Sequence, residues 1–119
     1  MSKPRLVVLH RNMGLLGGAQ RDLIVALPEH AKRWSITLAT LNAPRLLLDR
    51  CKQLGIEVVK PDVPWQLPTG PIAEVTARAG RSALKAWRKL RAKLQPSLDD
   101  ADACYVVLST GGMEVLDIV

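Results

Sequence analysis

The stretch Arg5–Leu27, RLVVLHRNMGLLGGAQRDLIVAL, decides the fold of this 119-residue chain. It begins with a short apolar run without alternation, Leu6–Leu9, which is typical of a parallel strand that is covered on both faces. A loop with three glycines follows, and apolar residues then recur at helical spacing up to Leu27. The stretch therefore predicts a strand, a glycine-containing loop and a helix that ends near Pro28–His30.

The rest of the chain continues this alternation of strands and helices. The second helix has Asn42 or Ala43 near its cap, Pro44 in its first turn and Gly55 as its stop. The alternation predicts an α/β fold: a Rossmann-like parallel sheet with helices on both faces, in one domain over residues 1–119. Further strands are expected at 35–41, 56–60 and 103–108, the last of them buried, and further helices at 42–54 and 72–94, the latter stopped by Gln95–Pro96.

Two segments depart from regular structure. Pro61–Pro71 contains four of the eight prolines and predicts a long loop. The last residues, GGMEVLDIV (111–119), predict a helix that begins at about Met113, whereas an open doubly wound sheet normally continues further. We therefore expect the chain to be the N-terminal part of a larger protein.

Composition predicts a folded, soluble protein. Hydrophobic residues make up 48% of the chain and charged residues 24%, which is enough for a buried core. Cys51 and Cys104 are far apart, form no CxxC and have no histidines at metal-ligand spacing, so we expect two reduced packing residues and no metal site. Neither a signal peptide nor a stretch of about 20 apolar residues is found, which predicts a cytoplasmic protein.

Two glycine-containing loops leave strand ends, where parallel α/β sheets bind their ligands. The first, Arg11–Gly18, is suited to an anion because its backbone N–H groups and a helix N-terminus would face the ligand. Its glycines equally fit a tight turn that lets the helix pack on the sheet. The second, Ser109–Gly112, is either a ligand loop or a polar turn, and neither loop is a Walker A or GxGxxG motif. His10 ends the first strand as a structural polar cap or as a catalytic group.

The helix start GGAQRDLIVAL, after a short strand and a loop, resembles the N-terminal domain of family-4 glycosyltransferases of the GT-B fold. Those enzymes show a Gly-Gly-Ala-Glu-Arg type of start to the first helix. The similarity continues through SITLATL and LLDRCKQLGIEVVKP, and it covers about residues 5–61. It implies two Rossmann-like domains that face a cleft: an N-terminal one for a hydroxyl acceptor, and a C-terminal one for the nucleotide-sugar donor, with no metal needed.

The resemblance also implies site residues. It places the glycine loop where backbone N–H groups approach the donor diphosphate. Many members have a histidine after the fourth strand, but YVVLSTGG has Ser109 and Thr110 there, so no catalytic histidine is carried over and the catalytic residues stay unknown. Without a donor domain the chain is expected to be inactive alone. The candidates are Gly14, Gly17 and Gly18 for the diphosphate, and His10, Arg11, Asn12, Ser109, Thr110 and Gly111 for the acceptor side.

A basic helix carries much of the net charge of +6. Seven cations and no acid lie between Arg78 and Lys93, opposite an apolar stripe. They form either an ordinary solvated face or a surface for an anionic membrane, which suits a lipid-linked acceptor. Nucleic acid is disfavoured because aromatic residues are not interleaved with the cations. The candidates for the membrane surface are Arg78, Arg81, Lys85, Arg88 and Lys89.

Other interpretations remain open at this stage. Trp65, in the proline-rich segment, either lines an acceptor groove or packs beneath the loop. The chain as a whole is alternatively a stand-alone Rossmann-like module that binds a nucleotide or a phosphorylated small molecule. A response-receiver domain is disfavoured because no acidic pocket follows the first strand. An exposed half-cleft would also favour a dimer.

Overall fold

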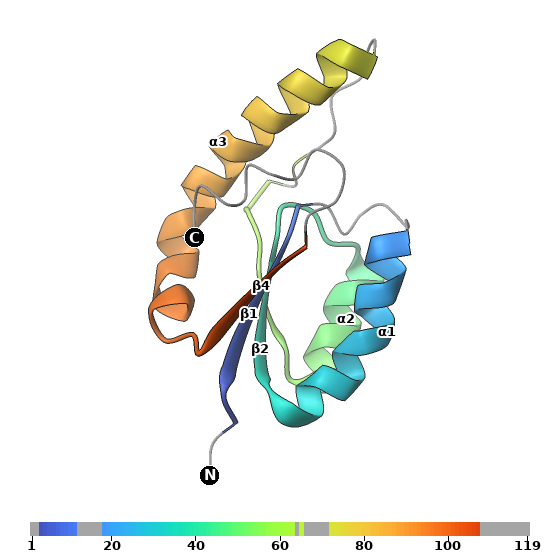
Figure 1. The fold of residues 1–119 in the computed structure, drawn as a ribbon, viewed down its shortest axis with the longest axis vertical. Helices are drawn as coiled ribbons and strands as arrows, with labels where there is room; N and C mark the ends of the chain where they lie inside the picture. Colours follow the sequence, from blue (N-terminus) through green and yellow to red (C-terminus); the bar gives the residue numbers. More distant parts are fainter. Residues whose placement is uncertain (1–2, 12–17, 64, 66–71, 108–119) are drawn as a thin grey trace.

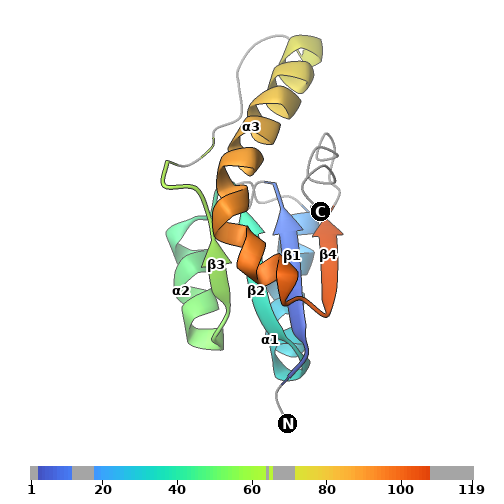
Figure 2. The ribbon, with the colours of Figure 1, turned by 90° about the vertical axis from the view of Figure 1, so that its left-hand side faces the viewer.

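The computed structural model describes residues 3–11, 18–63, 65 and 72–107, and these form a four-stranded parallel sheet with helices on both faces. Two helices cover one face and the third covers the other (Figure 1; Figure 2). The predicted Rossmann-like α/β fold is thus confirmed. The elements are β1 (Arg5–His10), α1 (Gly18–Arg33), β2 (Ser35–Thr40), α2 (Arg45–Leu54), β3 (Glu57–Val59), α3 (Ile72–Asp99) and β4 (Ala103–Val107).

The strands lie in the order β3-β2-β1-β4. β1 pairs with β2 along one edge and with β4 along the other, so Val8 lies opposite both Leu38 and Tyr105. The chain therefore builds outward from β1 to β3 and then returns, over α3, to the other side of β1. Because all strands are parallel, their carboxyl ends lie together at one end of the sheet. We call this end the carboxyl edge, or sheet edge, as distinct from the outer strands β3 and β4.

The core has two layers, one on each side of the sheet. α1 and α2 cover one layer, and α3 covers the other with a stripe of fully buried residues. This stripe is the apolar one expected opposite the cations. Its members in the described part of α3 are Ala83, Trp87, Leu90 and Leu94.

Two helices run past the prolines expected to end them. α1 continues through Pro28 to Arg33, and α3 continues through Pro96 to Asp99. A proline inside a helix removes a hydrogen bond and costs about 3 kcal/mol. Apolar contacts beyond each proline offset this cost, because Ala31 and Leu98 pack against the two core layers.

The second helix begins later than expected and ends as expected. Pro44 is the N-cap of α2 rather than part of its first turn, and its carbonyl accepts hydrogen bonds from the N–H groups of Leu47 (3.0 Å) and Leu48 (3.1 Å). Gly55 ends the helix in the left-handed conformation, with φ at 73°. A side chain would be strained there, which explains the glycine.

The expectation of a buried fourth strand was wrong. Within the described part of the chain, β4 pairs only with β1 and forms an edge of the sheet, and Tyr105 is 55% exposed. Cys104 is exposed too, so only Cys51 is the buried packing cysteine that we expected. Leu108, the helix expected from Met113 and most of Pro61–Pro71 lie outside the described residues.

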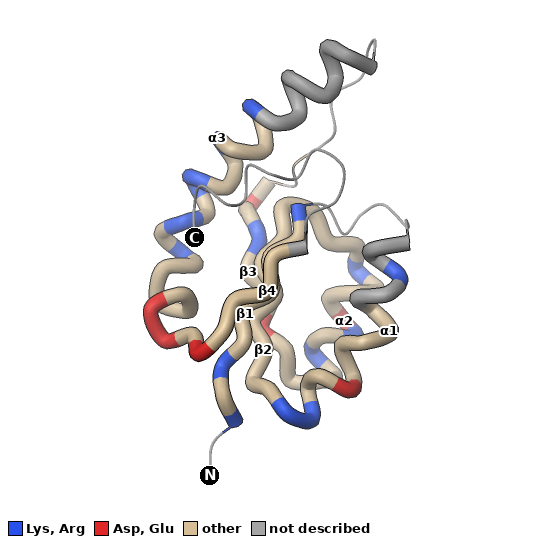
Figure 3. Tube along the Cα trace, in the orientation of Figure 1, with Lys and Arg blue, Asp and Glu red and all other residues tan. Residues whose placement is uncertain are grey.

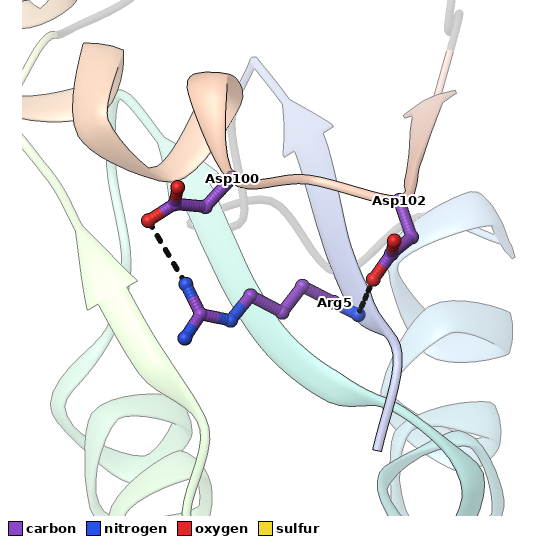
Figure 4. A network of polar contacts seen from close by, with 3 residues as sticks. All are labelled: Arg5, Asp100 and Asp102. Carbon is purple, nitrogen blue, oxygen red and sulfur yellow. Dashed lines mark hydrogen bonds and ion pairs between the residues drawn. The ribbon is translucent and has the colours of Figure 1, made fainter. Parts of the chain in front are cut away.

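A network of polar contacts holds the connection from α3 to β4 at the amino end of the sheet (Figure 4). The Arg5 guanidinium forms an ion pair with Asp100 at 2.9 Å, and the Arg5 N–H donates to the Asp102 carboxylate at 2.7 Å. The Asp102 N–H in turn donates to the Arg5 carbonyl at 2.8 Å. The exposed ion pair contributes little stability, but the two hydrogen bonds between the Arg5 backbone and Asp102 help to set the register of β4 against β1.

Truncation of a core leucine tests this packing. Leu38 in β2 is fully buried, so Leu38→Ala should lower the free energy of unfolding by about 2–5 kcal/mol. Leu46 on α2 is 83% exposed, and Leu46→Ala should change it by less than about 0.5 kcal/mol. Urea unfolding followed by circular dichroism measures both values, and equal losses would contradict the described core.

Candidate functional site

The strand order places a reversal point between β1 and β4. The chain runs from β1 towards β3 on one side and comes back to β4 on the other. In open α/β sheets, the crossover helices diverge at such a point, and ligands bind beyond the carboxyl ends of the two strands. The end of β1, with His10 next to Thr40 of β2 and Val107 of β4, is therefore the geometric candidate site.

His10 and Arg11, at the carboxyl end of β1, face opposite sides of the sheet. Val8 packs in the layer of α1 and α2, so alternation along β1 puts His10 on that side. Its side chain is fully buried. Burial, and secondly the charge of Arg11, lower the pKa of His10 below its usual 6.5, so the imidazole is neutral at pH 7. Full burial favours the interpretation of His10 as a polar cap of the strand.

Arg11 lies on the side of α3, where it contacts Trp65. Its guanidinium carbon is 5.4 Å from the centre of the Trp65 ring, within the range of a cation–π interaction. The indole N–H of Trp65 donates to the Ser82 hydroxyl of α3 at 2.6 Å. Trp65 is thus packed into the core and also joins the carboxyl edge of the sheet to α3.

Backbone hydrogen bonds extend the sheet beyond its strands at this edge. The Leu41 N–H donates to the Arg11 carbonyl, and the Trp65 N–H donates to the Leu41 carbonyl, both at 3.1 Å. These bonds hold the three segments that leave β1, β2 and β3 in register. They explain how Trp65, far along the chain, reaches Arg11, a contact for which the sequence carries no local signal.

The structure describes only part of the predicted glycine site. Gly18 is the first residue of α1, in agreement with the predicted helix start, and the N-terminus of α1 lies at the end of the sheet where β1 ends (Figure 1). The first turn of α1 contains no acidic residue that would oppose an anion. The remaining predicted members of this edge, Asn12, Gly14, Gly17, Ser109, Thr110 and Gly111, lie outside the described residues.

The basic surface lies along α3, on the face of the sheet opposite to α1 and α2. Lysines and arginines recur along α3, and acidic residues are confined to the end of its described part (Figure 3). Arg81, Lys85, Arg88 and Lys89 are exposed, as a solvated or membrane-facing surface requires. Arg78 also belongs to α3, but its side chain lies outside the described part of the structure.

Two hollows border this surface. The first, about 420 Å³, lies between α3 and residues 61–63 and 65, and the second is an open depression on α3 itself, between Arg81 and Lys89. Lys85 and Lys89 line both of them. Trp65 is buried and also lines the first hollow, so it packs as one of the two alternatives expects, and its place in an acceptor groove stays a prediction.

Residues 3–11, 18–63, 65 and 72–107 were also searched for metal and membrane features. They contain no group of three or more His, Cys, Asp or Glu side chains placed to hold a metal ion. None of their helices has the length and hydropathy that a membrane span requires. Comparison of the chain with protein-family models, curated proteins and solved structures finds no match.

The burial of His10 predicts a pH-dependent stability. Its lowered pKa means that the unfolded chain takes up a proton that the folded chain does not. Stability should therefore be full above pH 6.5 and fall below it, by at most about 1.4 kcal/mol per pH unit, until the folded-state pKa is passed. Urea unfolding between pH 5 and 8 should show this slope.

Two histidine variants test its origin. His10→Gln should remove the slope below pH 6.5, because no imidazole is left to protonate at the end of β1. His30 is exposed at the last turn of α1, and His30→Gln is the matched control that should keep the slope. The same slope in His10→Gln would contradict the assignment to His10.

Proposed function

We propose that the chain is the acceptor-side domain of a glycosyltransferase of the GT-B fold. Its parent enzyme would move a sugar from a nucleotide-sugar to a hydroxyl acceptor. The observation that carries the proposal is the reversal point between β1 and β4, with the start of α1 at the same edge. The GGAQR helix start and the stretches 35–41 and 47–61, which resemble family-4 members, add to it.

In this proposal, different groups at the carboxyl edge bind the donor diphosphate and the acceptor. The N-terminus of α1 carries partial positive charge and free backbone N–H groups, which suit the diphosphate that leaves the sugar. Arg11, held against Trp65, adds a full positive charge at the same edge. These groups would stabilise the charge of the departing diphosphate, while the rest of the edge positions the acceptor hydroxyl.

The proposal includes partners and a location. The donor nucleotide would be held mainly by a second domain, so this chain alone would be inactive and would need no metal. The acceptor would be lipid-linked, and the exposed cations of α3 would rest on the anionic cytoplasmic face of a membrane. Nucleic acid has no place in this arrangement, and a dimer remains a prediction from the exposed half-cleft.

A titration followed by nuclear magnetic resonance tests the diphosphate site. Inorganic diphosphate should shift the amide signals of His10, Arg11 and Gly18 with a dissociation constant of about 1 mM, because only half of the site is present. Arg11→Gln should weaken this binding by about tenfold, as expected for the loss of one charge-assisted contact. Arg33→Gln, at the exposed far end of α1, is the matched control and should leave it unchanged.

The same titration separates the proposal from its alternative, a stand-alone nucleotide module. If a second domain holds the nucleoside, uridine and adenosine diphosphates should bind no more than about twofold more tightly than diphosphate. A nucleoside that improves binding by more than about tenfold would support the stand-alone module instead. Unchanged amide signals at the end of β1 and the start of α1 would overturn both.

The membrane surface has its own test, co-sedimentation with lipid vesicles. The chain should sediment with vesicles that contain phosphatidylglycerol and stay in solution with phosphatidylcholine alone. Each cation near the surface contributes about 1 kcal/mol, so a variant with Arg81, Lys85, Arg88 and Lys89 changed to Ser should bind at least about tenfold more weakly.

A second variant controls for net charge alone. Arg33, Arg45, Arg50 and Lys52 are exposed on α1 and α2, on the opposite face of the sheet. Changing these four to Ser removes the same charge and should leave vesicle binding nearly intact. Unchanged binding in the α3 variant would contradict the membrane surface and would identify α3 as an ordinary solvated helix that covers the sheet.

A further inference from the structure

The groove between α3 and the segment Pro61–Trp65 has a charged wall and an apolar wall. Its volume is about 420 Å³, enough for a small amphiphilic molecule. Lys85, Lys89 and Lys93 form one wall at four-residue spacing, which brings them onto one side of α3. The opposite wall and the floor are mainly apolar, with Val63, Trp65 and Leu90.

Of the three lysines in the charged wall, only Lys93 is ion-paired within the described part of the chain. Lys93 forms an ion pair with Asp62 at 2.6 Å, and this contact holds the pKa of the Asp62 carboxyl below its usual value. Lys85 and Lys89 have no ion-pair partner among the described residues. Like charges four residues apart destabilise a helix, and an anion bound between them would offset that repulsion by its attraction to both ammonium groups.

Part of the apolar wall is open to a ligand. Val63 is 79% exposed at the rim of the groove, and Ala86, which also lines it, is half-buried, whereas Trp65 and Leu90 are buried. A single exposed valine has little meaning, but this one lines the same hollow as Lys85 and Lys89. A ligand that fits both walls carries an anionic group at one end and an apolar chain at the other.

We infer that this groove binds the phosphomonoester of a single-chain or short-chain amphiphile. The phosphate dianion would lie between the Lys85 and Lys89 ammonium groups, which match its charge, and the alkyl part would lie on Val63 and Ala86. The site is distinct from the edge of the sheet, because it needs neither Arg11 nor the N-terminus of α1. The inference goes beyond the proposed function and does not depend on diphosphate binding.

A titration with soluble probes tests the groove. The probes are dihexanoyl phosphatidic acid below its micelle concentration, inorganic phosphate, and dihexanoyl phosphatidylcholine, in which the phosphate carries a choline. Phosphatidic acid should shift the amide signals of Ala86 and Leu90 and the indole N–H signal of Trp65. It should bind at least about tenfold more tightly than inorganic phosphate, because buried methylene groups add to the charge contact. Phosphatidylcholine should bind as weakly as inorganic phosphate or more weakly.

Matched variants separate this site from general electrostatic attraction. The double change Lys85→Gln and Lys89→Gln keeps helix-forming side chains and should weaken phosphatidic acid binding by at least about tenfold. The pair Arg33→Gln and Lys52→Gln, exposed on α1 and α2, removes the same charge elsewhere and should change binding by less than about twofold. The spectra themselves report whether each variant is folded.

The contrary results are equally specific. Equal weakening by the two double variants, or equal affinity for phosphatidic acid and inorganic phosphate, would overturn the inference. A shift of the sheet-edge signals without any at Ala86 and Leu90 would overturn it as well. Failure of diphosphate to bind at His10 and Gly18 would contradict the proposed function. It would not contradict the groove inference if the Lys85 and Lys89 double variant still binds phosphatidic acid more weakly.

Discussion

Strand β1 is hydrogen-bonded along both of its edges, to β2 and to β4, and apolar residues cover both of its faces. Val7 and Leu9 face α3, and Val8 faces α1 and α2. This central position requires the chain to cross the sheet on both faces, and it makes the end of β1 the place where the crossovers diverge. The location of the candidate site follows from this one strand.

Trp65 connects that edge to the rest of the molecule. Its backbone extends the sheet next to Leu41, its ring lies under Arg11, and its indole N–H bonds to Ser82 of α3. The same ring forms part of the groove beside Lys85. The two regions that we propose as anion sites, one at the carboxyl edge of the sheet and one on α3, therefore both border the Trp65 side chain.

The sequence predicted those features of the fold that depend on interactions between neighbouring residues. The apolar run of β1, the start of α1 at Gly18 and the stop of α2 at Gly55 were all visible in the sequence, because each depends on a few neighbouring residues. The ends of α1 and α3 were not, since contacts of Ala31 and Leu98 with distant strands outweigh the prolines before them. The exposure of β4 and the contact between Arg11 and Trp65 depend on strand order and register, which no short stretch of sequence reveals.

The central claim is that the end of β1 and the start of α1 hold an anion. Tungstate is a tetrahedral oxyanion, as phosphate is, and its anomalous scattering marks where it binds in a crystal of the chain. We expect an anomalous peak at the first turn of α1, beside Gly18 and at the carboxyl edge of the sheet. Peaks confined to α3 or to lattice contacts, with none between β1 and α1, would contradict the claim.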